Sequence, residues 1–289
     1  MNIVVDRSFA AGDLLQALPI ATALEKMGHS VFVKCNSDLH FLVTRHRNNP
    51  LLSPLQEPFL LVDLNGAYEN HPDRKLLTFA EMYVESANKQ LQEAGIRIDP
   101  KQVLVPKLRR EWSSMAGAFL AKFPRPWVMI VPRSHSPHTQ LLPFSTVTPP
   151  AYNTQNRTVP DQTWCEASYA IKAACFWLGI HAPAPRNIIS VELYNLHDVV
   201  RVIDYADAVA TVDTGPMHIA CALGIKTVAV KQSADPQKTG GPSACLKVIQ
   251  PNLDCLACWQ PLCPINTDKP PCQEINPLLI ADAINEAIA

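Results

Sequence analysis

The stretch from Asp213 to His218 groups side chains and backbone that suit an anionic ligand carrying hydroxyl groups. Asp213, Thr214 and Gly215 follow an apolar run, and the next residue is Pro216, a preferred first residue of helices. The first turn of a helix offers unpaired N–H donors and a partial positive charge, which favour a phosphate. Thr214 adds a hydroxyl donor, and the Asp213 carboxylate can accept a hydrogen bond from a sugar. The spacing alone predicts either a phosphate-sugar site or an ordinary helix cap, with His218 as a polar residue of the helix.

The elements that must position this turn are a strand before it and a helix and a second strand after it. Residues 208–212 are apolar and rich in valine, which predicts a buried parallel strand, and residues 226–230 have a similar composition. Gly224 stands where the intervening helix is expected to end. Crossovers of this kind are right-handed, so we expect the turn at the carboxyl edge of a parallel sheet.

The same segment resembles a long family signature. Residues 213–224, DTGPMHIACALG, are similar to the D-x-G-x-x-H-x-A-A-A-L-G motif of glycosyltransferase family 9, the ADP-heptose:lipopolysaccharide heptosyltransferases. The resemblance implies an α/β fold of the GT-B type, in which two Rossmann-like domains with parallel sheets face each other across a cleft. It also implies a nucleotide-sugar donor held mainly by the second domain, and no cofactor required for catalysis. Asp213, Thr214, Gly215 and His218 then fall on donor-binding positions.

A second motif of the family stands near the start of the chain. Arg7, Gly12-Asp13 and Leu18-Pro19 match its basic residue, G-D and L-P at the family's spacing. The resemblance implies that Asp13 is the general base that deprotonates the acceptor hydroxyl. The alternative is an N-cap for a helix that begins after it, and we favour the catalytic role. Arg7 is either a contact for phosphate or acceptor, or a solvated charge of the loop.

The resemblance also implies a cation at Arg157, because Pro160 and Trp164 keep the family's downstream spacing. Cleavage of a glycosyl–phosphate bond leaves charge on the nucleotide diphosphate, and a guanidinium can stabilise that charge. Where the family has a compact phosphate loop, residues 132–159 form a long segment rich in Ser, Thr, Pro and His. Loops of this length commonly serve as lids, so closure over donor or acceptor is one expectation.

Two further donor positions are carried over from the family. Tyr194 lies in the connection that approaches the nucleotide base, which makes it a candidate for stacking on that base. Residues 235–241, DPQKTGG, resemble the D-P-x-x-x-G-G loop beside the donor, so Gly240 is assigned to the donor site. The alternative for the latter is an ordinary surface turn.

Four cysteines in a proline-rich segment form a candidate metal site: Cys255, Cys258, Cys263 and Cys272. Four thiolates complete a tetrahedral zinc or iron site, and a metal would organise a loop with few apolar anchors. Similar clusters occur in part of the family, and related protein heptosyltransferases carry a four-cysteine metal site. Buried free thiols, or a disulfide formed on oxidation, are the alternatives, since Cys263 and Cys272 are not an ordinary C-x-x-C pair. We favour a structural metal over both.

Length and composition limit the class of protein. With 289 residues the chain suffices for two α/β domains of modest size, and its formal net charge of −1 argues against a nucleic-acid partner. No apolar stretch approaches the roughly 18 residues of a membrane span. The N-terminus lacks the features of a signal peptide, so we expect the cytoplasm, with peripheral association with the inner membrane left open. Nine cysteines in that compartment argue against a disulfide scaffold.

The predicted organisation is an acceptor-side domain over residues 1–123 and a donor domain over residues 124–275, with the cysteine-rich segment at 255–272. A terminal helix at 276–289 is of the kind that commonly crosses back to the first domain. Further predicted strands lie at 2–5, 30–35, 59–64, 127–131 and 187–191, and further helices at 76–94, 160–178 and 195–205.

The resulting hypothesis is a glycosyltransferase of lipopolysaccharide biosynthesis or a related pathway. It moves a sugar, heptose by analogy, from a nucleotide-diphosphate donor to a hydroxyl of a glycan, a lipid-linked acceptor or a protein. One alternative is a sugar-nucleotide epimerase or hydrolase of the same architecture. Another is a non-catalytic nucleotide-sugar-binding or interaction protein, an option kept open by the short first domain and the altered phosphate loop. Asp13 and Arg157 argue against the latter.

Overall fold

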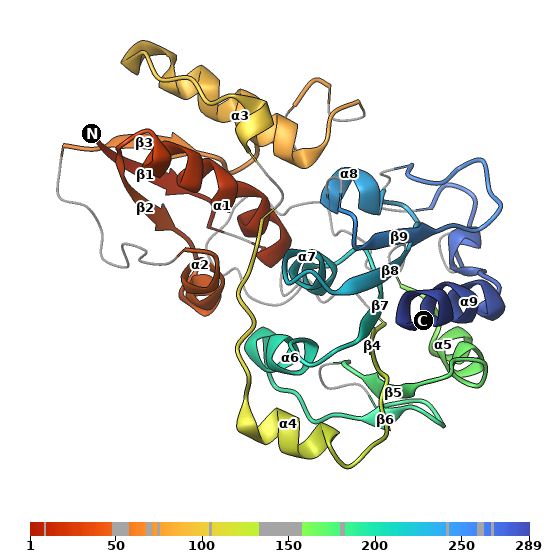
Figure 1. The fold of residues 1–289 in the computed structure, drawn as a ribbon. Helices are drawn as coiled ribbons and strands as arrows, with labels where there is room; N and C mark the ends of the chain where they lie inside the picture. Colours follow the sequence, from red (N-terminus) through yellow and green to blue (C-terminus); the bar gives the residue numbers. More distant parts are fainter. Residues whose placement is uncertain are drawn as a thin grey trace, which may run out of the picture. The chain divides into compact units, whose positions relative to one another are not determined.

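The computed structural model describes two compact units of the chain (Figure 1). The described residues are 1–8, 10–47, 58–67, 71–73, 76–103, 106–132, 158–179, 183–240, 243–258, 263–266 and 269–289. The first unit comprises Met1–Arg110 with Gln237–Ser243, and the second comprises Glu111–Pro236 with Ala244–Ala289. Both units contain parallel sheets with helices, which confirms the predicted α/β class.

A three-stranded parallel sheet in the order β2-β1-β3 organises the first unit. Val4 and Val5 at the centre of the sheet are buried, and helices α1 and α3 contact each other beside it (Figure 1). Its elements are β1 (Asn2–Asp6), α1 (Ala11–Lys26), β2 (Ser30–Lys34), α2 (His40–His46), β3 (Leu60–Asp63) and α3 (Phe79–Leu91), with short 3₁₀ helices at Ser37–Leu39, Gln92–Ala94 and Pro100–Gln102.

The carboxyl ends of these three strands are joined through Asp6. Its carboxylate accepts hydrogen bonds from Lys34 Nζ at 2.6 Å, Ser8 Oγ at 2.6 Å and Asn65 Nδ2 at 3.2 Å. Burial alone would raise the pKa of Asp6, but the hydrogen bonds from Lys34, Ser8 and Asn65 outweigh it and lower this pKa. An ionised carboxylate therefore links β1 to β2 and to the residues that follow β3.

A six-stranded parallel sheet in the order β6-β5-β4-β7-β8-β9 organises the second unit. The chain builds outward from β4 to β6, returns to the other side of β4 with β7, and builds outward again to β9. Its strands are β4 (Trp127–Val131), β5 (Ala174–Trp177), β6 (Ile189–Ser190), β7 (Ala208–Val212), β8 (Lys226–Val230) and β9 (Leu246–Ile249). The strand order reverses between β4 and β7, and doubly wound folds bind ligands beyond the carboxyl ends of the strands at such a point.

Helices cover both faces of this sheet (Figure 1). On one face α9 packs against β7 and β8 and α5 packs against α9, with Trp164, Ile280 and Ile284 fully buried. On the other face α7 contacts β7 and β8, and α6 contacts α7. The helices of this unit are α4 (Ser114–Leu120), α5 (Asp161–Ser168), α6 (Leu196–Ile203), α7 (Gly215–Ala222) and α9 (Pro277–Ile288), with a 3₁₀ helix at Pro271–Gln273. Helix α8 (Pro236–Gly240) follows β8, and its residues from Gln237 group with the first unit.

The second unit begins before the predicted domain boundary at residue 123. The segment from Glu111 groups with this unit, where Tyr205 Oη donates to the Ser113 carbonyl at 2.6 Å. Helix α9 packs on α5, β7 and β8. The predicted domain bounds and the crossing of the terminal helix to the first domain stay predictions.

Several predicted strands agree with the structure, but one predicted helix does not. The strands at 127–131, 208–212 and 226–230 are confirmed with the same bounds. The predicted helix at 160–178 is wrong in its second half, because α5 ends at Ser168 and residues 174–177 form β5. Cys175, Phe176 and Trp177 are buried, and β5 pairs in parallel with β4, so sheet pairing outweighed the helical spacing of the apolar residues.

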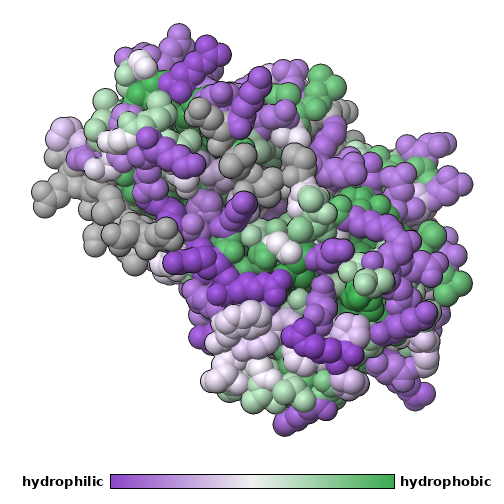
Figure 2. Space-filling view, viewed as in Figure 1, coloured by the Kyte–Doolittle hydropathy of each residue, from purple (hydrophilic) through white to green (hydrophobic). Residues whose placement is uncertain are grey.

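The surface is mixed in character. On the face shown in Figure 2, hydrophilic residues predominate and apolar residues are scattered among them. Within the described part of the chain, no helix combines the length and the apolar character needed to cross a membrane.

The Asp6 hydrogen bonds predict a specific acid sensitivity. Because the folded-state pKa is lowered, the stabilisation is present above the unfolded value of about 3.9 and is lost as pH falls through the folded value. Asp6→Asn should lower the free energy of unfolding at pH 7 by about 1–3 kcal/mol. In urea unfolding this deficit should shrink towards pH 3, because the wild-type carboxylate becomes neutral too.

The control is Asp38→Asn, at an exposed carboxylate of the same unit. That variant should match the wild type at both pH values. A deficit for Asp6→Asn that stays constant between pH 7 and pH 3 would contradict the assigned role of the ionised group.

Candidate functional site

The predicted donor residues lie at the point where the strand order of the second sheet reverses. Asp213 and Thr214 directly follow β7, and α7 begins at Gly215. Both side chains are buried, with Asp213 and Thr214 each 4% exposed. Thr214 Oγ1 lies 3.2 Å from Thr211 Oγ1 and makes no side-chain cap of α7. Thr214 therefore does not act as an ordinary side-chain cap of this helix.

The first turn of α7 offers fewer backbone donors than the sequence suggested. The N–H groups of Met217 and His218 donate back to the Thr214 carbonyl at 3.0 Å and 3.4 Å, and Pro216 has no N–H. The Gly215 N–H has no hydrogen-bond partner among the described residues. Gly215 has no side chain to obstruct an approaching ligand, so one backbone donor is accessible here.

His218 is the most informative side chain of this turn. It is 8% exposed, and its Nε2 lies 3.6 Å from Asp213 Oδ1. Its Nδ1 is buried without a hydrogen-bond partner in the described part of the chain. Native proteins rarely leave a buried ring nitrogen unpaired, because the lost hydration is costly. This nitrogen, in the same helical turn as Gly215, makes the start of α7 a candidate binding site for a polar ligand.

The carboxyl end of β8 lies beside that of β7 and adds charged groups to the same edge. Lys231 Nζ pairs with Asp235 Oδ2 at 3.1 Å, and both side chains are largely buried. The predicted loop after Asp235 is partly helical: α8 starts at Pro236 and ends at Gly240, which is buried. Gly241 falls outside the described residues.

Tyr194 precedes α6 and is 63% exposed. Its hydroxyl donates to the Glu192 carboxylate, and this hydrogen bond raises the pKa of Tyr194. Its backbone N–H donates to Asp198 Oδ2 at 3.3 Å. The hydrogen bonds of the hydroxyl and of the backbone N–H therefore orient Tyr194, and the exposed side chain is available to a stacking partner.

The predicted leaving-group cation, Arg157, lies outside the described residues, as does most of the predicted 132–159 loop. The described chain resumes at Thr158, the residue that follows Arg157. The Thr158 carbonyl accepts a hydrogen bond from Gln232 Nε2 at 3.0 Å. The first described residue after the loop is thus tied to the carboxyl end of β8.

Asp13 belongs to the first unit and is paired with Arg7. The distance from Arg7 Nη2 to Asp13 Oδ2 is 2.6 Å. Helix α1 begins at Ala11, so Asp13 lies within its first turn and is not the N-cap that the alternative interpretation required. Arg7 is 3% exposed and lies 5.7 Å from the centre of the Tyr83 ring, which excludes a solvated loop charge. The guanidinium is thus in direct contact with the Asp13 carboxyl.

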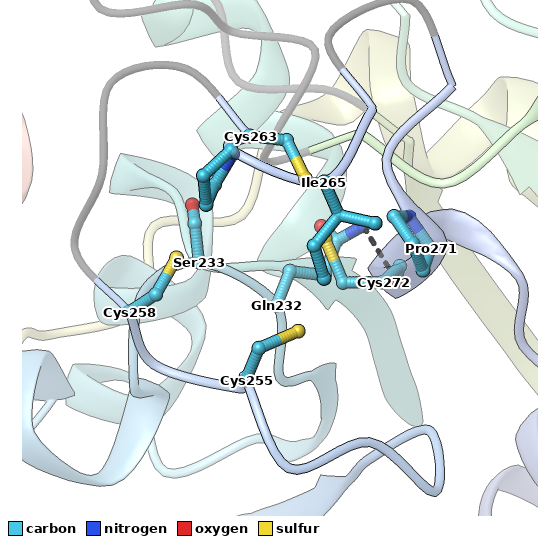
Figure 3. A pocket seen from close by; sticks show the side chains of 9 residues that line it. Gln232, Ser233, Cys255, Cys258, Cys263, Ile265, Pro271 and Cys272 are labelled. Carbon is cyan, nitrogen blue, oxygen red and sulfur yellow. Dashed lines mark hydrogen bonds between the residues drawn. The ribbon is translucent and has the colours of Figure 1, made fainter.

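The four predicted metal ligands come together around one small cavity of about 30 Å³ (Figure 3). Cys263 and Cys272 are each 8% exposed, and all four cysteines are free thiols. Burial, and after it the neighbouring thiols, raises the pKa of Cys272 to about 11. A cavity of this size holds a single ion or water molecule.

The thiols do not form a ready ligand set in their present orientations. Among the described residues, no three His, Cys, Asp or Glu side chains are grouped so that they could hold a metal ion. The chemistry of four thiols nevertheless suits zinc or iron, and the backbone brings all four to one cavity. Binding would require the side chains to rotate inward.

Gln232 is a site residue that sequence analysis missed. It is 2% exposed and lines the same cavity as the four thiols. A single glutamine after a strand matches no motif, and its partners at Thr158 and Cys272 are distant in sequence. The one available signal was its place between a predicted strand and Asp235.

Comparison with known families gives a direct match. Residues 192–267 match the sequence model of Glycosyltransferase family 9 (heptosyltransferase). This range contains the predicted donor residues from Tyr194 to Gly240 and the first three cysteines of the cluster. The predicted resemblance to the family is thereby confirmed. No curated protein sequence matches the chain significantly.

Solved structures share the fold over nearly the whole chain. A family 9 glycosyltransferase from Veillonella parvula is 14% identical, with a TM-score of 0.66 over 99% of this chain and 97% of that one. ADP-heptose lipopolysaccharide heptosyltransferase II from E. coli is 14% identical, with a TM-score of 0.63 over 100% and 98%. The iron-containing dodecameric glycosyltransferase TibC from E. coli is also 14% identical, with a TM-score of 0.63 over 99% and 77%. At such identities the likeness shows the common fold.

Proposed function

We propose that this family 9 glycosyltransferase transfers a sugar, heptose by analogy with its relatives, from a nucleotide-diphosphate donor to an acceptor hydroxyl. The observation that carries the proposal is the buried Nδ1 of His218, which has no hydrogen-bond partner among the described residues and lies in the same helical turn as Gly215. Both belong to the helix that begins after β7, where the strand order reverses. A bound donor would satisfy both groups at once.

The donor-site roles follow from the chemistry of each group. The Gly215 N–H and the positive end of α7 suit a phosphate oxygen, and Thr214 adds a hydroxyl. Asp213 is an acceptor for a hydroxyl of the sugar or ribose. We assign Tyr194 to stacking on the base and Gly240 to the loop beside the donor. ADP-heptose is the proposed donor, because the E. coli relative named for this substrate has the same fold.

The transfer step requires a base and a stabilised leaving group. In our proposal the Asp13 carboxylate accepts the proton of the acceptor hydroxyl, and that oxygen attacks the anomeric carbon. The bond from this carbon to the phosphate oxygen breaks, and ADP departs with the electron pair. Arg157 then stabilises the charge of the diphosphate, a role supported by its sequence spacing from Pro160 and Trp164. The contact with Arg7 would hold the Asp13 carboxylate in position.

We assign a different substrate to each of the two units. The first, with Asp13, would hold the acceptor, and the second, with Asp213 and His218, would hold the donor. A glycan of lipopolysaccharide type, a lipid-linked sugar or a protein hydroxyl is the proposed acceptor. A lipid-linked acceptor would bring the enzyme to the inner face of the membrane.

The cysteine cluster is the proposed site of one structural zinc or iron ion. The ligands would be Cys255, Cys258, Cys263 and Cys272, which line one cavity. TibC, which has the same fold as this chain, is described as iron-containing, and this supports iron as one candidate for the bound metal. The metal would cross-link a segment with little regular structure, and four thiolates leave no coordination position for substrate.

The donor site can be tested with ADP alone. In Gly215→Val the branched side chain should keep the phosphate away from the backbone N–H of this residue. Loss of a hydrogen bond to a charged group costs about 1.5–3 kcal/mol, so ADP binding should weaken by about 10- to 100-fold. The measurement is isothermal titration calorimetry on folded protein. Ile219→Val is the matched control on the same helix, and it should cost stability without changing ADP affinity. Unchanged affinity in folded Gly215→Val would remove this turn from the site.

The base assignment predicts a loss of turnover without a loss of binding. Asp13→Asn keeps the shape and the contact with Arg7 but loses basicity, so turnover should fall by about 100-fold or more. The measurement is ADP release from ADP-heptose with lipopolysaccharide acceptors, alongside ADP affinity, which should stay near wild type. Asp38→Asn serves as the exposed control. Normal turnover combined with early melting would reduce Asp13 to a structural partner of Arg7.

The metal proposal predicts about one equivalent of zinc or iron in purified protein. Replacing Cys255 and Cys258 together by Ser should release the metal and lower the melting temperature, because metal binding is coupled to folding. Cys35→Ser, in the other unit, is the control and should retain the metal. Metal-free wild-type protein with the same melting temperature as the double variant would leave only the packing of free thiols.

A further inference from the structure

Gln232 joins the carboxyl end of β8 to the cysteine-rich segment. It follows Lys231, which directly succeeds β8, and its backbone carbonyl accepts a hydrogen bond from Ala257 N–H at 2.8 Å. Ala257 lies between Cys255 and Cys258 and has a φ of 56°. A non-glycine residue rarely adopts this left-handed conformation without outside support. The Gln232 carbonyl thus helps to hold the turn that carries two of the thiols.

The side-chain amide of Gln232 makes two more connections. Its Nε2 donates to the Thr158 carbonyl at 3.0 Å and to the Cys272 carbonyl at 3.4 Å. Figure 3 shows Gln232 among the cysteines, with its hydrogen bond to Cys272 as the dashed line. Both partners are acceptors, so the amide nitrogen must face them and the orientation of the amide is determined.

The oxygen of the Gln232 amide, Oε1, is buried and lacks a hydrogen-bond donor among the described residues. The residue lines the cavity of the four thiols, and a thiol S–H is a donor that such an oxygen can use. The Gln232 amide therefore connects the cavity of the thiols with the Thr158 carbonyl.

We propose that Gln232 is a positioning residue that couples the cysteine cluster to the donor site. This inference rests on the proposed function. The Gln232 amide nitrogen donates to both the Thr158 and the Cys272 carbonyls. A shift of the segment at Thr158 is therefore expected to move the segment at Cys272, and the reverse. Thr158 follows Arg157 in the chain, and the Asp235–Lys231 ion pair flanks Gln232 at the edge that includes the donor residues. Coupling of this kind works in both directions: donor binding changes the reactivity of the thiols, and modification of the thiols changes the affinity for the donor.

The test measures this reciprocity with ADP and a thiol-alkylating reagent on the full chain as purified. Iodoacetamide labelling is resolved by mass spectrometry of the peptides that contain Cys255, Cys258, Cys263 and Cys272. In the wild type, saturating ADP should slow labelling of these four cysteines by at least about threefold, and prior labelling should measurably weaken ADP binding. Cys35, in the other unit, serves as the internal reference.

Gln232→Met preserves the volume of the side chain but removes the amide. In this variant ADP should leave the labelling rates unchanged, and labelling should leave ADP affinity unchanged. Gln162→Met is the matched control, because this exposed glutamine of the same unit bonds only locally, to Glu166 at 2.8 Å. It should keep the wild-type coupling. Gln232→Asn is the second variant, since its shorter amide cannot serve both carbonyls and should lose the coupling too.

The outcomes separate the two proposals. If ADP binds the wild type but has no effect on labelling, the inference fails and the proposed donor site stands. If Gln232→Met or Gln232→Asn retains the wild-type coupling, Gln232 is not the connection. If ADP does not bind the wild type at all, the proposed function fails and the inference fails with it.

Discussion

Parallel pairing of β7 between β4 and β8 determines where the groups of the donor site lie. Hydrogen bonding in register brings the carboxyl ends of the three strands to one edge, so that Asp213, Lys231 and the end of β4 are neighbours there although they are far apart in sequence. Because the strand order reverses between β4 and β7, no crossover connection passes over the carboxyl ends of these two strands. Helix α7 then starts at this edge, which places Gly215 and His218 in its first turn.

Buried charged groups are paired in both units. In the first, Asp6 and Asp13 have the cationic partners Lys34 and Arg7, and in the second, Lys231 pairs with Asp235. Both units also contain buried polar atoms without a hydrogen-bond partner among the described residues, for example Arg47 Nη1 and His218 Nδ1. Such an atom is a cost that a ligand can remove. The edge of the second sheet is assigned to the donor because His218 also belongs to the segment that matches the family model.

The cysteine segment depends on the sheet rather than on its own chain. It contains few hydrophobic anchors, and its turns are held by a hydrogen bond that Ala257 N–H donates to the Gln232 backbone carbonyl and by one that Gln232 Nε2 donates to the Cys272 carbonyl. The same amide nitrogen donates to the Thr158 carbonyl at the end of the long loop. One buried residue therefore joins three segments through its backbone and its side chain. This arrangement helps to form a cavity lined by four thiols next to the carboxyl end of β8.

Some features depend on only a few adjacent residues, and the sequence determined these by itself. They are the strands at 127–131, 208–212 and 226–230 and the end of a helix at Gly224, which has a φ of 73°. The asparagine caps of α6 and α9 are local in the same way. The family motif likewise placed Asp213 and His218 beside a helix start. Tertiary structure alone decided that residues 174–177 form β5, that Arg7 is buried against Asp13, and that Gln232 joins the cysteines to Thr158. These outcomes depend on sheet pairing and on compensation of buried polar groups by residues that are distant in the chain or that share no recognisable pattern. Periodicity and spacing carry no information about such partners.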